Sequence, residues 1–311
     1  MKQAQFADIA FHIGKSIFTS SSALFLKTND HKNTSVPYLT ITMKSLFDAA
    51  KYCLNACEVD QKLHLTEQTA QFWRQDLLSI ESRQEPEPIG EPGRPVKPDL
   101  VIPGNVPKRR LGTKTGLVAL IHAITHIEFN AINLAWDAVY RFRQLPMQFY
   151  SDWIQVACEE AYHFQLLRKR LNEFGHDYGD LPAHNGLWEM ARKTAFDPMI
   201  RMALVPRVLE ARGLDVTPGI IERLRIAGEE KTVEILEIIL RDEIGHVKIG
   251  SNWYQYFCNQ RGLNPDHTFS ELLNRYYSGQ LTGPFHYEAR QQAGFTDAEL
   301  KALACMENRK T

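Results

Sequence analysis

From Thr113 to about Cys258 the sequence carries apolar residues at intervals of three and four, with almost none of the alternation typical of strands. That period gathers the apolar side chains on one face of an α-helix. A stretch of this length holds several such helices, which must bury their apolar faces against one another. The sequence therefore predicts an all-α core domain at residues 113–258.

The rest of the chain divides into four further segments. Residues 1–42 show no clear period and are predicted to form a peripheral N-terminal segment, whereas helical periodicity marks residues 43–84. Residues 85–112 hold Pro and Gly too densely for regular structure, which predicts an extended connector. Residues 259–311 combine helical content with Pro and Gly breaks and are predicted to be a C-terminal helical extension.

Proline positions predict an irregular third helix in the core domain. Asp197 and Pro198 suit an N-cap and the first helical position. Thr217 and Pro218 repeat that signal, so we expect the helix to be broken into two pieces there. Pro206 removes a backbone hydrogen bond, which predicts a kink near the middle of the first piece.

Three acids are each followed by a histidine three residues later: Glu160 and His163, Glu173 and His176, and Glu243 and His246. Two such side chains lie on one face of a helix and can share a metal ion. Chance alone gives about one pair in a chain with 37 acids and 11 histidines, so the context must distinguish them. Glu173 and His176 lie at a predicted helix end, where solvated charge is ordinary, and we assign them no metal.

The other two pairs interrupt apolar stripes. Phe149, Trp153, Val156 and Leu167 surround the first pair, and Leu236, Ile239, Trp253 and Phe257 surround the second. Glu128 and Glu210 interrupt similar stripes 32 and 33 residues before Glu160 and Glu243. Two helical hairpins would bring each acid to the height of its partner. The 50 residues between the hairpins predict a four-helix bundle with one long crossover.

Four carboxylates that converge in an apolar bundle repel one another and are costly to desolvate, and two divalent cations would neutralise them. A protonated or Arg-bridged buried network is the alternative. The sequence thus predicts a two-metal site with six ligands: Glu128, Glu160, His163, Glu210, Glu243 and His246.

Four stretches carry a family resemblance: His126-Ile127-Glu128, Glu159-Glu160-Ala-Tyr-His163, Leu209-Glu210-Ala-Arg and Arg241-Asp242-Glu243-Ile-Gly-His246. Between about Met43 and Cys258 the chain resembles an uncharacterised ferritin-like family known as domain of unknown function 455. It is more distantly similar to the tRNA-modifying di-iron hydroxylases.

The resemblance implies a role for each ligand. Glu160 and Glu243 would bridge two metal ions, and each ion would be completed by one further glutamate and one histidine, namely Glu128 with His163 and Glu210 with His246. The preceding acids Glu159 and Asp242 would orient the imidazoles. Tyr162, which flanks the first motif, is predicted to lie beside the ligands.

The two motifs in their apolar stripes, together with the resemblance, predict an O2-dependent oxidoreductase of hydroxylase or oxidase type. The cofactor would be two metal ions, with iron favoured, manganese or a mixed Fe/Mn pair as alternatives, and zinc disfavoured. The reaction would need O2 or peroxide, a small-molecule or tRNA substrate of unknown identity, and an electron donor if the protein is an oxygenase. The alternatives are a metal-handling or peroxide-scavenging protein without an organic substrate, and an interaction protein with a vestigial site.

Further features of the sequence indicate the cellular compartment and candidate residues for a substrate lid. A net charge of −1 gives no global attraction to nucleic acid or membranes, and five scattered cysteines suit a reducing compartment, so a cytoplasmic protein without a membrane-spanning segment is predicted. The crossover is rich in polar and aromatic groups, and its His184 and Trp188 are candidates for a substrate lid. No catalytic side chain is assigned beyond the metal centre.

Overall fold

The computed structural model describes residues 44–82, 84–107, 112–277 and 281–308, and these residues form helices with no β-strand among them. The prediction of an all-α protein is confirmed. The predicted peripheral segment 1–42 lies outside the described residues.

The described residues up to the end of the crossover form five α-helices and a short 3₁₀ turn, η1 (Pro103–Asn105). The helices are α1 (Leu46–Asn55), α2 (Val59–Arg74), α3 (Lys114–Arg141), α4 (Met147–Glu173) and α5 (Gly186–Lys193). The later part holds α6 (Pro198–Leu204), the π-helical segment η2 (Val205–Glu210), α7 (Ala211–Ile226), α8 (Glu230–Gln260), α9 (Pro265–Tyr276), α10 (Tyr287–Gln292) and α11 (Asp297–Asn308).

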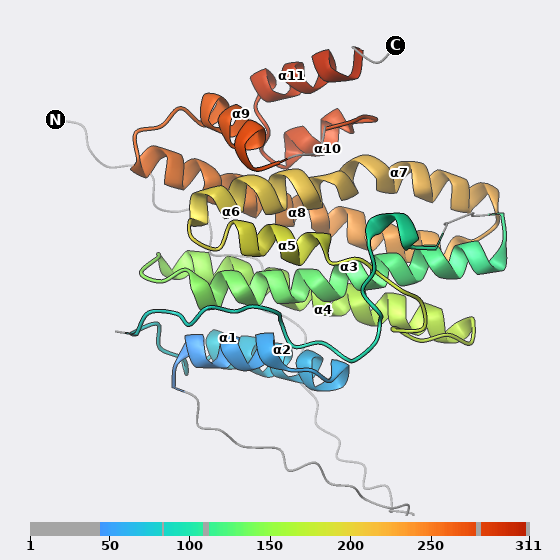
Figure 1. Ribbon diagram of the computed structural model, residues 1–311, viewed down its shortest axis with the longest axis horizontal. Coiled ribbons are helices and arrows are strands. Elements are labelled where there is room, and N and C mark those ends of the chain that lie inside the picture. Colours follow the sequence, from blue (N-terminus) through green and yellow to red (C-terminus); the bar gives the residue numbers. More distant parts are fainter. Residues whose placement is uncertain (1–43, 83, 108–111, 278–280, 309–311) are drawn as a thin grey trace, which may run out of the picture. The chain divides into compact units, whose positions relative to one another are not determined.

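Two helical hairpins form the centre of the described part (Figure 1). In the first, α3 and α4 are joined by residues 142–146 and pack along each other, and in the second α8 packs against α6, η2 and α7. The hairpins meet where α4 contacts α8. Helices α1 and α2 pack on the α3–α4 side, whereas α9 and α10 contact the second hairpin. The two motif helices, α4 and α8, are therefore direct neighbours.

Helix starts follow the capping signals of the sequence. The Thr113 side chain accepts a hydrogen bond from the backbone N–H of Gly116 at the start of α3. The Asp197 carboxylate accepts from Met199 at the start of α6, with Pro198 at the first helical position. Each cap satisfies a backbone donor that the helix itself leaves unpaired.

The predicted break at Pro218 is wrong, because Pro218 lies inside the continuous helix α7. Leu214, Ile221 and Leu224 on α7 are buried in the core. We attribute the continuity to this burial, which offsets the cost of about 3 kcal/mol that an interior proline imposes. The irregularity lies instead at η2, which contains Pro206, where the kink was predicted.

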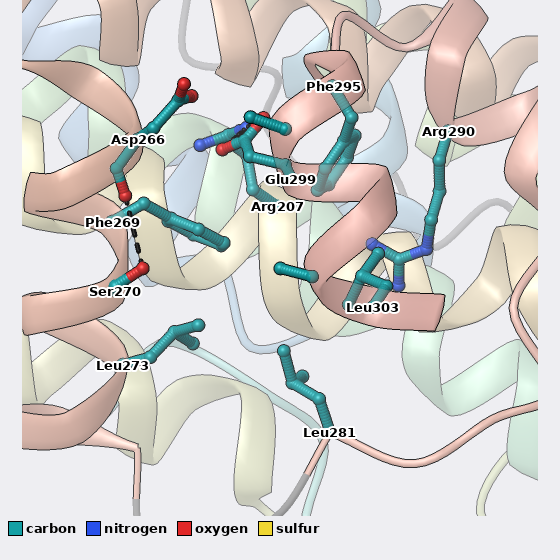
Figure 2. A pocket seen from close by; sticks show the side chains of 12 residues that line it. Arg207, Asp266, Phe269, Ser270, Leu273, Leu281, Arg290, Phe295, Glu299 and Leu303 are labelled. Atoms are coloured by element: carbon teal, nitrogen blue, oxygen red, sulfur yellow. Dashed lines mark hydrogen bonds and ion pairs between the residues drawn. The ribbon is translucent and has the colours of Figure 1, made fainter. Parts of the chain in front are cut away.

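Two contacts hold η2 in place. Pro206 packs against Gly250 of α8 so closely that a Cβ added to the glycine would lie 2.3 Å from the proline Cγ. The guanidinium of the next residue, Arg207, is buried and donates to both carboxylate oxygens of Glu299 in α11 at 2.7 and 2.8 Å (Figure 2). The rings of Phe269 and Phe295 flank it. Contacts from the C-terminal region therefore stabilise the irregular turn.

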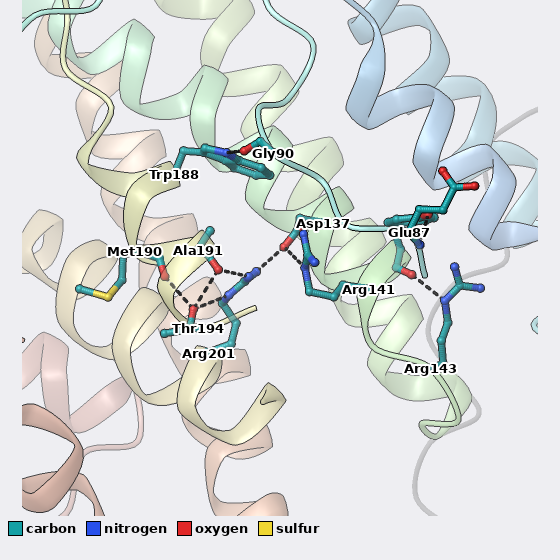
Figure 3. Close-up of polar contacts among 11 residues, drawn as sticks. Glu87, Gly90, Asp137, Arg141, Arg143, Trp188, Met190, Ala191, Thr194 and Arg201 are labelled. Carbon is teal, nitrogen blue, oxygen red and sulfur yellow. Dashed lines mark hydrogen bonds and ion pairs between the residues drawn. The ribbon is translucent and has the colours of Figure 1, made fainter. Parts of the chain in front are cut away.

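A buried ion pair joins the two hairpins at a second point (Figure 3). Arg201 of α6 donates to Asp137 of α3 at 2.6 Å, and Asp137 also accepts from Arg141. The side chains of Asp137 and Arg201 are both buried, and Arg201 also donates to the hydroxyl of Thr194. Because the fully buried guanidinium of Arg201 is paired with Asp137 and hydrogen-bonded to Thr194, the network fixes α6 against α3.

One described helix, α3, is long and apolar enough to cross a membrane by length and composition alone. Its most apolar window is 89% buried inside the protein, which is typical of a core helix.

Candidate metal centre

The two predicted motifs meet at the contact of α4 with α8. The Nδ1 atom of His163 lies 3.4 Å from one oxygen of Glu160, and the Nδ1 atom of His246 lies 3.1 Å from its other oxygen. Glu243 is 3.9 Å from the same atom of His246. Both imidazoles and Glu160 are buried. Glu160 therefore stands between two imidazole rings that come from different helices.

The preceding acid of each motif supports the histidine of the other motif. Asp242 of α8 accepts a hydrogen bond from Nε2 of His163 at 3.1 Å, and Glu159 of α4 accepts from Nε2 of His246 at 2.7 Å. A carboxylate on Nε2 fixes the ring orientation and directs Nδ1 inward. These bonds agree with the orienting role that the family resemblance implies.

Glu128 of α3 joins the same cluster, with its Oε2 atom 3.2 Å from Nδ1 of His163. One ligand atom from each of Glu128, Glu160, His163 and Glu243 lies within 4.8 Å of the others. The first three residues are buried, and the side chain of Glu243 is 12% exposed. Oxygen and imidazole nitrogen atoms at this separation can hold a metal ion.

Glu210 approaches from the opposite hairpin at the end of η2. Its Oε2 atom is buried, and its charge interacts with those of Glu243, Glu160 and His246. It is not one of the four residues within 4.8 Å. The predicted sixth ligand is therefore beside the cluster, and the π-helical turn sets its position.

Burial and mutual repulsion govern protonation in the metal-free cluster. Burial raises the pKa of Glu128 and of Glu210 well above the ordinary value, and neighbouring carboxylates raise it further. Burial opposes the charge of Glu160, but the adjacent imidazoles outweigh it and hold the pKa of Glu160 low. Burial also opposes the charge of His163, yet the Glu128 and Glu160 carboxylates raise its pKa to about 11. Protons thus supply the positive charge that the cluster needs.

Several buried atoms of the predicted ligands nevertheless have no hydrogen-bond partner. They are both oxygens of Glu160, one oxygen each of Glu210 and Glu243, and Nδ1 of His246. The 3.1 Å approach of His246 to Glu160 is short enough for a hydrogen bond, but its angles are not suitable. Unsatisfied buried polar atoms cost about 1–3 kcal/mol each, and more when charged. Metal ions bound among them would satisfy all of these atoms, so the donor set fits a cationic cofactor.

The remaining predicted site residues lie outside the cluster. Tyr162 is 49% exposed, and its ring centroid is 6.4 Å from that of His163, so the structure does not bring it among the ligands. Trp188 is fully buried and donates to the carbonyl of Gly90, which makes it an anchor rather than a lid (Figure 3). His184 does line a cavity beside the centre. The pair Glu173 and His176, to which no metal was assigned, forms separate ion pairs with Arg170 and Lys231, and with Asp180.

The cavity has a volume of about 550 Å³ and opens on the carboxylate side of the centre. Glu128, Glu210 and Glu243 form part of its wall, whereas neither ligand histidine does. This volume lies within the range of roughly 300–1,000 Å³ that is typical of small-molecule sites. A bound molecule would therefore meet the centre from the carboxylate side.

Sequence reasoning missed the polar groups that surround this cavity. Arg212, Asp215 and Arg290 line it, and Arg290 belongs to the C-terminal region in which no chemical motif was found. Arg290 pairs with Asp215 across 75 residues. No local pattern signals a contact between residues so far apart.

The fold and the cluster define an all-α protein with a buried carboxylate–histidine centre beside a cavity. The chain matches the family model described as "Protein of unknown function (DUF455)" over residues 55–301, and it belongs to that family. It is 51% identical over 213 residues to an uncharacterized protein of Haemophilus influenzae, a match that covers 66% of this chain and 74% of that protein. No solved structure matches it significantly.

The crossed hydrogen bonds lead to a first prediction. The change Asp242→Ala removes the carboxylate that orients His163, and we expect metal affinity to fall about 10- to 100-fold. Competition with a chelator measures this affinity. Glu237→Ala on the same helix removes an exposed partner of Arg225 and serves as the control. Equal affinities of the two variants would show that the bond from Asp242 does not position the imidazole.

Proposed function

We propose that this protein is a ferritin-like four-helix bundle that holds two metal ions, with iron favoured, and that it catalyses an O2-dependent oxidation. Helices α3, α4, α8 and the helix formed by α6, η2 and α7 would be the four members of the bundle. The crossover from α4 to α6 would be the long connection that such bundles contain.

One observation carries the proposal: the two imidazoles turn Nδ1 toward Glu160 while each Nε2 is held by a carboxylate from the other motif. Stability alone does not explain this buried network, because apolar residues of similar volume are usually at least as stabilising as buried ionic groups. The ring orientations suit metal coordination, since both Nδ1 atoms face the buried carboxylates among which an ion would be held.

The six predicted ligands would be shared between the two ions. Glu160 and Glu243 would help to hold both ions, Glu128 and His163 would complete the ligands of one ion, and Glu210 and His246 would complete those of the other. When bound, a pair of iron(II) ions supplies electrons for the reduction of O2. The apolar wall of the cavity would exclude water from the reaction, and the open carboxylate side would admit the substrate.

The cavity favours an enzyme over a metal-handling or peroxide-scavenging protein. Neither of those alternatives requires a largely apolar cavity of about 550 Å³ beside the ligands. An organic substrate does, because burial in such a space holds the reacting atom near the centre.

The proposal is tested by loading the protein with iron(II) without oxygen and then admitting O2. We expect two metal ions per chain, O2 consumption that depends on them, and a product one oxygen atom or two hydrogen atoms different from a compound in a host metabolite or tRNA fraction. Fewer than one ion per chain would refute the metal centre. Rapid peroxide consumption without any organic product would instead support the scavenging alternative.

Proton release gives a second prediction. The raised pKa of His163, about 11, means that this imidazole is protonated in the metal-free protein at neutral pH. A metal ion can bind only the deprotonated ligand, so binding must release protons and the apparent affinity must rise with pH. Calorimetric titration with manganese(II) in two buffers of different ionisation enthalpy measures the protons released between about pH 6 and 8. An affinity independent of pH over this range would contradict the protonated state.

A further inference from the structure

The inner part of the cavity beside the proposed centre is apolar. Its wall there consists of Leu120 and Ile124 of α3, Val216 and Ile220 of α7, and Leu236 and Ile239 of α8. Leu120 lies eight residues before Glu128, a rise of about 12 Å along the helix. The cavity therefore reaches from the carboxylates along the helices past a continuous apolar lining, which cannot satisfy a charge or an unpaired polar group.

Apart from the three carboxylates of the proposed centre, the charged groups of the cavity wall are two arginines and one aspartate. Asp215 is buried and accepts two hydrogen bonds from Arg290, at 2.8 and 2.7 Å (Figure 2 labels Arg290). Arg212 lies 3.6 Å from the same carboxylate, with its side chain 41% exposed. Two guanidinium groups thus share one carboxylate, and the trio carries one net positive charge.

Arg212 is held at the rim of the cavity. Its Nη1 atom donates to the carbonyls of Thr282 and Pro284, at 2.8 and 3.2 Å. These bonds use one of its three guanidinium nitrogens and fix the direction of the group. A partly exposed guanidinium that is fixed in this way is suited to bind a carboxylate or a phosphate.

We infer that the substrate is an amphipathic anion whose apolar body lies along the inner wall and whose carboxylate or phosphate group binds Arg212. The inference rests on the proposed function, since it takes the cavity as the substrate site of the metal centre. The negative group cannot lie on the apolar inner wall, and Arg212 supplies the unbalanced positive charge that it needs.

The test measures binding to the protein loaded with manganese(II), with metal content determined first. Decanoate, decyl phosphate, decanol and decylammonium are titrated by calorimetry. We expect at least one of the two anions to bind about tenfold or more tightly than decanol, and decylammonium to bind weakest. The ratio of the two anions tells whether the site prefers a carboxylate or a phosphate.

Arg212→Gln is the deciding variant, because an anion could also coordinate the metal directly. We expect this change to abolish the preference of the anions over decanol, whereas Arg223→Gln, an exposed arginine of the same helix, should leave it intact. Equal binding of anions and decanol by the unmodified protein would overturn the inference. So would a preference that persists in Arg212→Gln. Failure of the proposed function would appear separately, as a metal content below two per chain before any ligand is added.

Discussion

The change Glu160→Gln is expected to reduce the bound metal from two ions per chain to less than one. Glu160 is within 3.4 Å of His163 and 3.1 Å of His246, so its two oxygens face the nitrogens that would hold different ions. Glutamine keeps the shape but removes the negative charge and turns one oxygen into an N–H₂ donor. We expect the affinity for both ions to fall more than about 100-fold, beyond the range typical of supporting residues.

The control for this prediction comes from the chain itself. Glu173→Gln alters the same four-residue pattern at the end of α4, where the glutamate pairs with Arg170 and Lys231 at the surface. We expect two metal ions per chain to remain and the stability of the fold to be unchanged, because Glu173 lies at the surface. Metal content after dialysis and chelator competition measure both variants. Retention of two tightly bound ions by Glu160→Gln would refute its place between them.

The change Gly250→Ala is expected to make the protein easier to unfold and to displace the proposed ligand Glu210. A Cβ at this position would lie 2.3 Å from Cγ and 2.4 Å from Cβ of Pro206, distances at which one helix must move. Such overpacking costs about 1–3 kcal/mol. Pro206 belongs to the π-helical segment that ends at Glu210, so movement of η2 should also lower the metal content from two ions to about one.

Gly245→Ala is the matched control on the same helix, one residue before His246. Nothing lies within 4 Å of a Cβ added there, and the residue is exposed. We expect the free energy of unfolding to rise by about 0.5–1 kcal/mol, because alanine favours the helix over glycine. Urea denaturation and metal analysis of both variants check the pair. If Gly250→Ala is as stable as Gly245→Ala and binds two ions, the contact of Pro206 with α8 does not set the position of Glu210.

The sequence by itself determined the helical class and the residues of the cluster. An acid and a histidine three positions apart share a helix face whatever the rest of the fold does, so Glu160 with His163 and Glu243 with His246 could be found from local spacing. The apolar stripes around them indicated burial, and they distinguished these pairs from Glu173 and His176.

Tertiary structure decided the partners that lie far apart along the chain. Asp242 supports His163 across 79 residues, Arg290 pairs with Asp215 across 75, and Arg207 pairs with Glu299 across 92. The periodicity of a helix says which of its faces is buried, but it does not say which residue of another helix will lie opposite. That choice depends on the packing of whole helices, and no local spacing records it.

The third helix also shows that local sequence rules do not decide tertiary structure. Local rules for proline predicted a kink at Pro206, where the irregular turn η2 lies, and also a break at Pro218, where α7 is continuous. A proline costs a helix a fixed few kcal/mol, and burial of the surrounding apolar side chains decides whether the helix continues. The sequence thus determined which residues can form the centre. The packing of α8 against Pro206 and the ion pair of Arg207 with α11 decided that the third helix becomes irregular at η2. They therefore decided where Glu210 lies.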